Sequence, residues 1–226
     1  MSSRWLSPVL AVAMAVFALV VFDRLPAEVP VHFGWNGPDD WMPRWPGAFL
    51  PPAIILGLWL LLPVLRRIDP RRANYERFNE TWWLFLNVMA LLLAAIHLMV
   101  LADGLGWPVD LSRAPYILLG FLFIGLGNYL PRLRSNWWMG IRTPWTLESE
   151  SVWRDTHRLG GRTFVIGGLL VLVIAFLPPV VRAWFASVAL GNAVIIPAVY
   201  SYFAYRRERA SVAASSPDNA ASGALP

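Results

Sequence analysis

The chain has 226 residues, of which 57% are hydrophobic and only 15% are charged. Soluble domains carry roughly 25% charged residues, so this composition indicates an integral membrane protein. Cysteine is absent, which excludes disulfide frameworks, thiolate catalysis and cysteine-ligated metals. All 19 basic residues are arginines dispersed around apolar segments, so we interpret the net charge of +5 as a topology signal and expect no direct nucleic-acid binding.

Six apolar segments are each long enough to cross a bilayer as a helix, which takes about 20 residues. The first leads into Asp23-Arg24-Leu25-Pro26 rather than a small-residue cleavage site, so we expect an uncleaved span. The last two are separated by Pro178-Pro179 and a few further residues, which is typical of a tight helical hairpin. The expected spans are residues 5–22, 47–65, 82–101, 114–130, 163–180 and 183–203.

The arginines predict how these spans are oriented. Fifteen lie before the first span, in loops 66–81 and 131–162, or after the last span, and four lie on the opposite side. Cytoplasmic loops carry the excess of arginine and lysine, so we place both termini in the cytoplasm. The predicted fold is an all-α integral membrane protein, a six-transmembrane-helix bundle with a short interfacial cytoplasmic helix between spans four and five.

The first non-cytoplasmic loop, residues 23–46, is unusually rich in turn-forming and aromatic residues. Residues 29–33 favour an extended segment, and Asn36-Gly37 favours a tight turn, although Pro38 limits regular hairpin pairing. The loop is either an ordered cap on the bundle or a surface that recognises an outside ligand through its tryptophans and acids.

His32, Asp39 and Asp40 in this loop carry atoms that could ligate a metal. One histidine and two adjacent carboxylates, with no helix to fix them, form a weak metal-binding pattern. We therefore predict no metal site.

Ionisable residues inside a bilayer are costly, and His97 is the one clear case in the predicted spans. No Asp or Glu lies within a predicted span, so a neutral His97, either bonded across helices or reaching the interface, is favoured over a proton relay. Asn192 is a second intramembrane polar residue. Several glycines in spans four and five indicate close helix packing: Gly120, Gly125, Gly127, Gly167 and Gly168.

Loop 131–162 carries the most particular sequence in the chain. Thr146 is a suitable N-cap, and Gly160-Gly161 is a typical helix stop, so we expect a helix over residues 147–159 lying on the membrane surface. On that helix Trp153 and His157 share a face. The rigid run Gly140-Ile141-Arg142-Thr143-Pro144-Trp145 before it has no explanation in these terms.

The segment "GNYLPRLRSNWWMGIRTPWTLESESVWRDTHRLGG" resembles the signature of the SdpI family of bacterial membrane proteins. The matching positions are Asn136, Gly140 to Leu147, Ser149-Glu150, Val152-Trp153 and Thr156-His157. The stretch "LPAEVPVHFGWNGPDDW" is similar to a domain of unknown function at the N-terminus of many SdpI-like proteins. The resemblance divides the chain into residues 1–65, residues 66–209 and a disordered tail, residues 210–226.

The resemblance implies a multi-pass immunity protein of the bacterial cytoplasmic membrane. The founding member protects against a secreted toxin peptide that collapses the membrane potential, and it holds a small winged-helix repressor at the membrane. Carried over by position, the toxin contacts outside are His32, Trp35, Gly37, Asp39 and Asp40. The repressor dock inside comprises Asn136, Gly140, Arg142, Thr143, Pro144, Trp145, Trp153, His157 and Arg158.

Two other functions stay open. A small transporter or exporter of a peptide or other solute is compatible with His97 and the glycine-rich spans. A membrane-embedded enzyme could use Arg142, Glu150 and His157 on a lipid headgroup. We favour a non-enzymatic protein without a cofactor, because the sequence contains no HExxH, GxSxG or phosphate-loop motif.

Overall fold

The computed structural model describes residues 3–34 and 37–214. Within them, six helices are long and apolar enough to cross a membrane, which confirms the six-span prediction. These helices are α1 (Leu6–Val21), α2 (Arg44–Ile68), α3 (Asn79–Gly104), α4 (Ala114–Tyr129), α6 (Glu150–Ile174) and α7 (Pro179–Ala214). The remaining elements are β1 (Glu28–Gly34), β2 (Gly37–Pro43), α5 (Pro144–Glu148) and 3-10 segments at Ser3–Trp5, Phe22–Arg24, Arg72–Phe78 and Leu130–Arg132.

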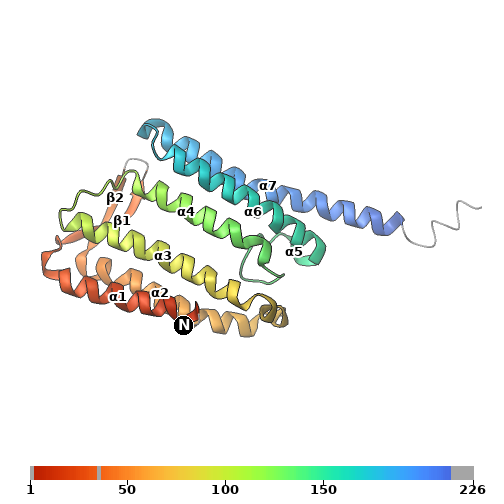
Figure 1. Cartoon of the computed structure of the whole chain (residues 1–226), viewed down its shortest axis with the longest axis horizontal. Coiled ribbons are helices and arrows are strands. Elements are labelled where there is room, and N and C mark those ends of the chain that lie inside the picture. Colours follow the sequence, from red (N-terminus) through yellow and green to blue (C-terminus); the bar gives the residue numbers. More distant parts are fainter. Residues whose placement is uncertain (1–2, 35–36, 215–226) are drawn as a thin grey trace, which may run out of the picture.

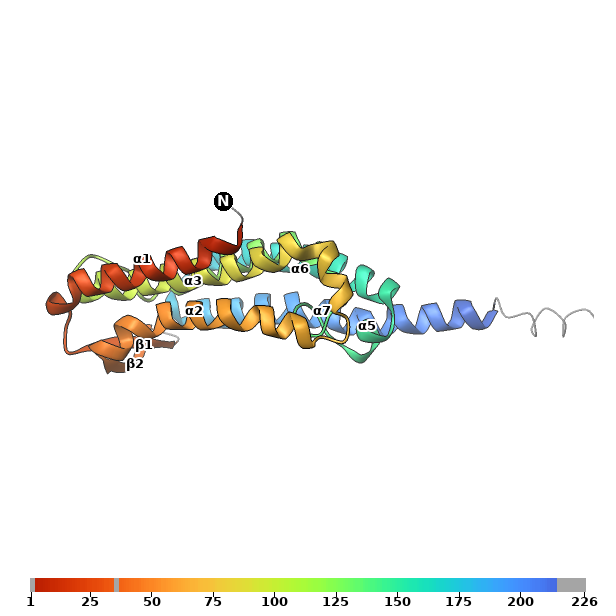
Figure 2. The same cartoon turned by 90° about the horizontal axis from the view of Figure 1, so that it is seen from below.

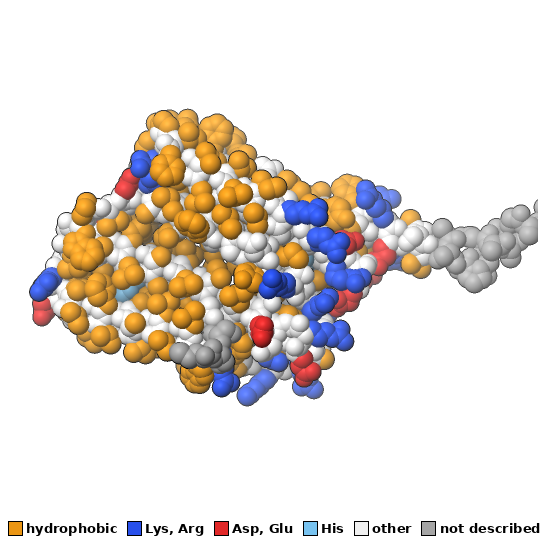
Figure 3. Space-filling model, in the orientation of Figure 1, with side chains coloured by type: hydrophobic (Ala, Val, Ile, Leu, Met, Phe, Trp, Pro, Cys, Tyr) orange, Lys and Arg blue, Asp and Glu red, His pale blue; other side chains and the backbone are white. Residues whose placement is uncertain are grey.

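The spans form two groups of three that follow the chain. Helices α1, α2 and α3 pack on one another, α4 and α7 pack on either side of α6, and α3 joins the groups by packing on α4 (Figure 1). The β1–β2 hairpin lies at one end of the bundle and α5 at the other (Figure 2). Apolar side chains cover the body of the visible face, and arginines gather at the α5 end (Figure 3). This arrangement is that of a multi-pass membrane protein.

Helices α4 and α6 touch almost backbone to backbone. A Cβ on Gly127 would lie 2.8 Å from the Gly161 carbonyl oxygen, and a Cβ on Gly168 would lie 2.6 Å from the Gly120 carbonyl oxygen. Real Cβ atoms do not approach backbone oxygens so closely. The predicted glycine packing is confirmed at Gly120, Gly127 and Gly168, and Gly161 is a fourth member.

The predicted helix over residues 147–159 is wrong in its boundaries. α5 ends at Glu148, and α6 begins at Glu150 and runs without interruption to Ile174, past Gly160-Gly161. The two glycines serve close packing within one helix instead of ending it. A short helix between spans four and five does exist, but it is α5.

The helix caps differ from the prediction as well. Thr143, and not Thr146, is the N-cap of α5, with a reciprocal pair of hydrogen bonds between Thr143 and Thr146. Pro144 then occupies the first helical turn, where a missing N–H costs nothing. Ser149 is the N-cap of α6, accepting from the Val152 N–H at 3.3 Å.

The loop after α1 forms a two-stranded antiparallel hairpin, which the all-α description did not include. Glu28 pairs with Pro43 at its base and Gly34 with Gly37 at its tip, with register shifts on both sides of His32. The hairpin is therefore paired but irregular, as Pro38 predicted. Its base is anchored by Val29, which is fully buried against Gly47 of α2.

The disordered tail is predicted to begin at residue 210, but α7 continues to Ala214. Residues 210–214 belong to α7, and three of the five are alanine, the residue that most favours helix. The rest of the predicted tail, residues 215–226, lies outside the described residues.

Candidate functional site

The end of the bundle opposite the hairpin is closed by a structure that we call the polar cap. It consists of residues 69–78, residues 133–143 and α5, seated on the first turns of α6. Asn136 and the Gly140–Leu147 run of the family-like motif lie in the cap, and the later motif positions lie at the N-cap and in the first turns of α6.

Asn136 folds the loop that precedes the Gly-Ile-Arg-Thr-Pro-Trp run. Its side-chain oxygen accepts from the backbone N–H groups of Trp138 and Met139 at 2.9 and 2.7 Å. Its amide nitrogen donates to the carbonyls of Arg134 and Met139. Asn136 is fully buried, so its role in the structure is to hold the turn.

His157 is the buried centre of the motif. The Ile141 backbone N–H donates to its Nε2 at 3.0 Å, so Nε2 carries no proton. The proton therefore sits on Nδ1, which donates to the Trp153 carbonyl at 2.8 Å. The Trp153 and His157 rings stack with their centroids 4.1 Å apart, which confirms that the two residues share a face of the helix. A neutral imidazole thus ties the Gly140–Trp145 run to α6.

Gly140 lies against the same imidazole, next to its Nε2 atom. Its φ is +104°, a conformation that favours glycine, and a Cβ there would collide with the His157 ring. The glycine of the motif is required both by backbone conformation and by space.

Thr143 and Trp145 attach the run to α7. The hydroxyl of Thr143 lies 2.9 Å from the Ser201 hydroxyl, and the Trp145 ring makes an edge contact with Tyr202 at 5.0 Å. The polar cap is therefore bonded to α6 and to α7.

Asp69, which sequence reasoning missed, joins the cap to the first half of the chain. This buried carboxylate accepts from the Trp137 N–H at 2.9 Å, the Arg71 N–H at 2.7 Å and the Tyr75 hydroxyl at 2.5 Å. The Arg71 guanidinium donates to the Ser135 hydroxyl and the Leu147 carbonyl. An aspartate directly before a proline at a helix end is a turn signal that could have identified it.

Three dock residues are accessible: Arg142, Pro144 and Arg158 are exposed. Arg142 also donates to the Trp137 carbonyl, whereas no side-chain partner of Arg158 is found in the described part of the chain. Gly140, Thr143 and Trp145 are partly buried, and Asn136, Trp153 and His157 are fully buried. The motif thus divides into buried or partly buried residues that hold the cap on α6, and three exposed residues, two of which are arginines.

At the hairpin, His32 Nδ1 lies 2.5 Å from Asp39 Oδ1, and both side chains are more than half exposed. Gly37 has a φ of +126° at the turn, and Asp40 accepts from the Trp41 N–H. Trp35 lies outside the described residues. Across residues 3–34 and 37–214, no group of three or more His, Asp or Glu is placed to hold a metal ion. The structure therefore brings His32 and Asp39 together as a polar pair on the hairpin surface.

His97 bonds across helices, the first of the two alternatives favoured above. Its Nε2 lies 2.9 Å from the Ala48 carbonyl of α2, so this nitrogen carries the proton. Ala48 needs an outside donor, because Pro52, four residues later, has no N–H to complete the helical hydrogen bond. His97 thus supplies the hydrogen-bond donor to the Ala48 carbonyl that Pro52 cannot provide.

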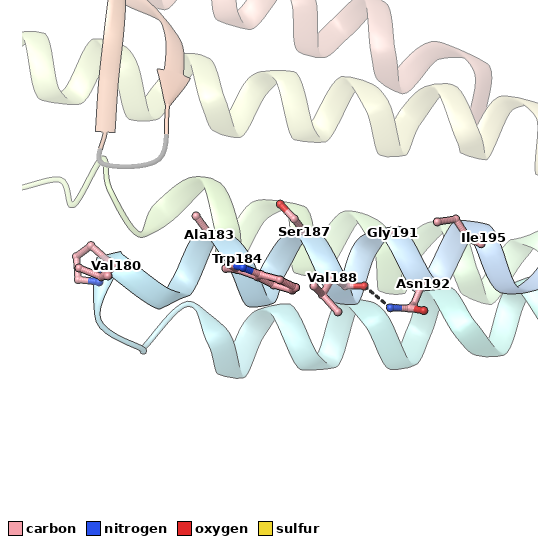
Figure 4. A pocket seen from close by; sticks show the side chains of 9 residues that line it. Val180, Ala183, Trp184, Ser187, Val188, Gly191, Asn192 and Ile195 are labelled. Carbon is pink, nitrogen blue, oxygen red and sulfur yellow. Dashed lines mark hydrogen bonds between the residues drawn. The ribbon is translucent and has the colours of Figure 1, made fainter.

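Asn192 lies on the surface of α7, in a shallow groove (Figure 4). Its amide donates to the Val188 carbonyl of the same helix at 2.8 Å. Small residues, including Ser187 and Gly191, line the groove. Asn192 is therefore satisfied within its own helix.

Comparison with known proteins places these features in a family context. Residues 132–201 match the SdpI/YfhL protein family, and residues 9–56 match a domain of unknown function, DUF1648. The chain is 27% identical over 191 residues to the immunity protein SdpI of Bacillus subtilis strain 168, covering 84% of this chain and 89% of that protein. No solved structure matches. These matches confirm the resemblance that the motif residues indicated.

Proposed function

We propose that this chain, with its SdpI/YfhL and DUF1648 segments, is an immunity protein of the bacterial cytoplasmic membrane that protects its host from a secreted, membrane-active peptide. The observation that carries the proposal is the match to an immunity protein over 84% of the chain. The six apolar helices support it, because they suit a protein embedded in the membrane that such a peptide attacks.

The test is complementation. The chain is expressed in a Bacillus subtilis strain that lacks SdpI, and the cells are exposed to supernatant from toxin-secreting cells while a potential-sensitive dye reports membrane potential. We expect cells carrying the chain to keep their potential and empty-vector cells to lose it. Equal collapse in both strains, with the protein present in the membrane, would contradict immunity to this toxin and leave the transporter as the alternative.

We further propose that the two exposed arginines of the motif, Arg142 of the polar cap and Arg158 of α6, dock a small winged-helix repressor. The supporting observation is that Arg142 and Arg158 remain accessible while the motif residues around them are bonded into the cap. A basic surface suits an acidic patch on a protein partner. Trp153 and His157 then contribute by holding the surface in place.

Charge-removing variants test the dock. Arg158→Gln and Arg142→Gln should lower recovery of the repressor with membranes while protection from toxin is retained. Arg207→Gln, an exposed arginine of α7 outside the motif, is the matched control and should behave like the unchanged protein. Recruitment that is equal in all variants would show that the repressor binds elsewhere.

A further inference from the structure

A pocket of about 540 Å³ lies at the edge of the polar cap, between the end of α2, the 3-10 segment Arg72–Phe78 of the cap and the start of α3. It belongs to neither of the surfaces considered above. The residues that give it chemical character are Arg66, Arg67, Arg72, Glu76, Trp82 and Trp83.

The charge of the lining favours an anion. Three arginines face one glutamate, and across the described ranges none of these arginines forms an ion pair with a carboxylate. Arg66 is held in place, since it donates to the Asn79 side-chain oxygen at 2.6 Å and lies over the Tyr75 ring. Arg67 and Arg72 are exposed and free to turn toward a ligand.

Trp82 supplies an independent observation. Its side chain is fully buried, and its indole N–H has no hydrogen-bond partner among the described residues. A buried donor left unpaired destabilises the folded chain, so a native protein usually provides an acceptor. Trp82 is one of the residues that line the pocket, so an acceptor bound there would lie beside the residue that carries this unpaired donor.

The position of the pocket distinguishes a lipid from a small soluble anion. It lies where the apolar surface of α2 gives way to arginines: Leu60, Leu61 and Val64 are exposed just before Arg66 and Arg67. Trp83 in the lining is of the type that favours the headgroup level of a bilayer. A molecule with a phosphate in the pocket could lay its acyl chains along these α2 residues.

We propose that this pocket binds the phosphate of an anionic phospholipid headgroup. Arg67 and Arg72 clamp the phosphate, Arg66 adds a fixed positive charge, and Trp82 Nε1 donates to a phosphate oxygen. The lipid joins α2 to the segment that leads into α3. The proposal requires only that the chain is embedded in a membrane and is independent of immunity.

The experiment measures binding of short-chain phosphatidylglycerol to the purified full-length protein in detergent, with phosphatidylcholine of the same chain length and inorganic phosphate as comparison ligands. We expect phosphatidylglycerol to bind most tightly. The double variant Arg67→Gln/Arg72→Gln should bind it at least about tenfold more weakly, the loss expected for charge-assisted hydrogen bonds.

The matched control is Arg77→Gln/Arg134→Gln, which removes the same charge from exposed positions outside the pocket. This control should change the affinity less than about twofold, since the general positive charge is lowered equally. The single variants Arg67→Gln and Arg72→Gln, each changing one exposed side chain, give the same comparison if the double variant does not fold. Trp82→Phe should also weaken binding, through loss of the N–H donor.

Three results would overturn the proposal. Equal affinity for phosphatidylglycerol and phosphatidylcholine would show that the pocket does not select an anionic headgroup. Equal losses in the pocket and control variants would reduce the effect to general surface charge. Inorganic phosphate binding as tightly as the lipid would assign the pocket to a soluble anion.

Discussion

The imidazole of His157 stands so close to Gly140 that a side chain on Gly140 would collide with its Nε2 atom. The same nitrogen accepts the Ile141 N–H, so the run that begins at Gly140 is fixed against α6 by contact and by a hydrogen bond. The most family-specific stretch of the chain is therefore explained first by folding.

Gly140→Ala should destabilise the protein by about 2–4 kcal/mol, from strain at positive φ together with the collision with His157. Gly106→Ala is the matched control: its φ is +79°, but nothing lies within 4 Å of the added methyl group, so only the strain of about 1 kcal/mol remains. Thermal unfolding of the purified variants measures both. Equal losses of unfolding free energy in the two variants would mean that the His157 ring moves aside without a measurable cost.

The bond between His97 and Ala48 can be tested by a double-mutant cycle. His97→Leu should cost about 1–3 kcal/mol in a chain that has Pro52, because the Ala48 carbonyl is left buried and unpaired. In a Pro52→Ala background the helix supplies its own N–H, so the same change should cost less by about 1 kcal/mol. Identical costs in the two backgrounds would show that the proline gap is not what His97 satisfies.

Close packing of α4 on α6 predicts an asymmetry among glycines. Gly161→Ala places a methyl 2.8 Å from a backbone carbonyl that cannot move aside, and it should cost about 1–3 kcal/mol. Gly191→Ala, in α7 with nothing within 4 Å, should be neutral or stabilise by up to about 1 kcal/mol. Denaturant unfolding in micelles gives both numbers, and a neutral Gly161→Ala would argue against backbone contact.

Asp69→Ala should be among the most damaging single changes outside the spans. It removes the acceptor of two backbone N–H groups and of the Tyr75 hydroxyl, which are left without partners at a cost of roughly 1–3 kcal/mol each, with incomplete additivity. Limited proteolysis should then cut loop 131–143. Glu76→Ala, an exposed acid of the same region, is the control and should leave the loop resistant.

His32→Ala separates recognition from stability at the hairpin. The His32–Asp39 pair is well exposed, so its loss should change the unfolding free energy by less than about 1 kcal/mol. Protection in the complementation assay should fall if the hairpin contacts the toxin. Retained protection would leave the hairpin as an ordered cap.

Much of the fold could be predicted because it depends on long, uniform signals. The six apolar stretches each comprise many residues, and the six long helices follow from them. The asymmetry of the arginines predicts the orientation of these helices, which stays a prediction. The contact of Trp153 with His157 was equally accessible, since it depends only on helical spacing.

The errors came from residues whose role depends on a distant partner. Gly160-Gly161 has the composition of a helix stop, but it lies inside α6, where an added Cβ on Gly160 would meet Ile141 and one on Gly161 would meet Gly127 and Pro131. The role of Asp69 was not predictable from local sequence, because its partners Tyr75 and Trp137 come from two segments that only the folded chain brings together. Tertiary contacts outweighed local preference in both cases.

Helix α2 begins where β2 ends and ends at Ile68, directly before Asp69 of the polar cap. Helix α2 has 25 residues and is therefore about 38 Å long. The hairpin is joined to its N-terminal end, and the buried carboxylate of Asp69 is joined to its C-terminal end. No loop lies between β2 and α2, so a tilt of the hairpin is passed directly to the N-terminal end of α2. The tilt must displace the hydrogen-bonded carboxylate or bend the helix at its prolines.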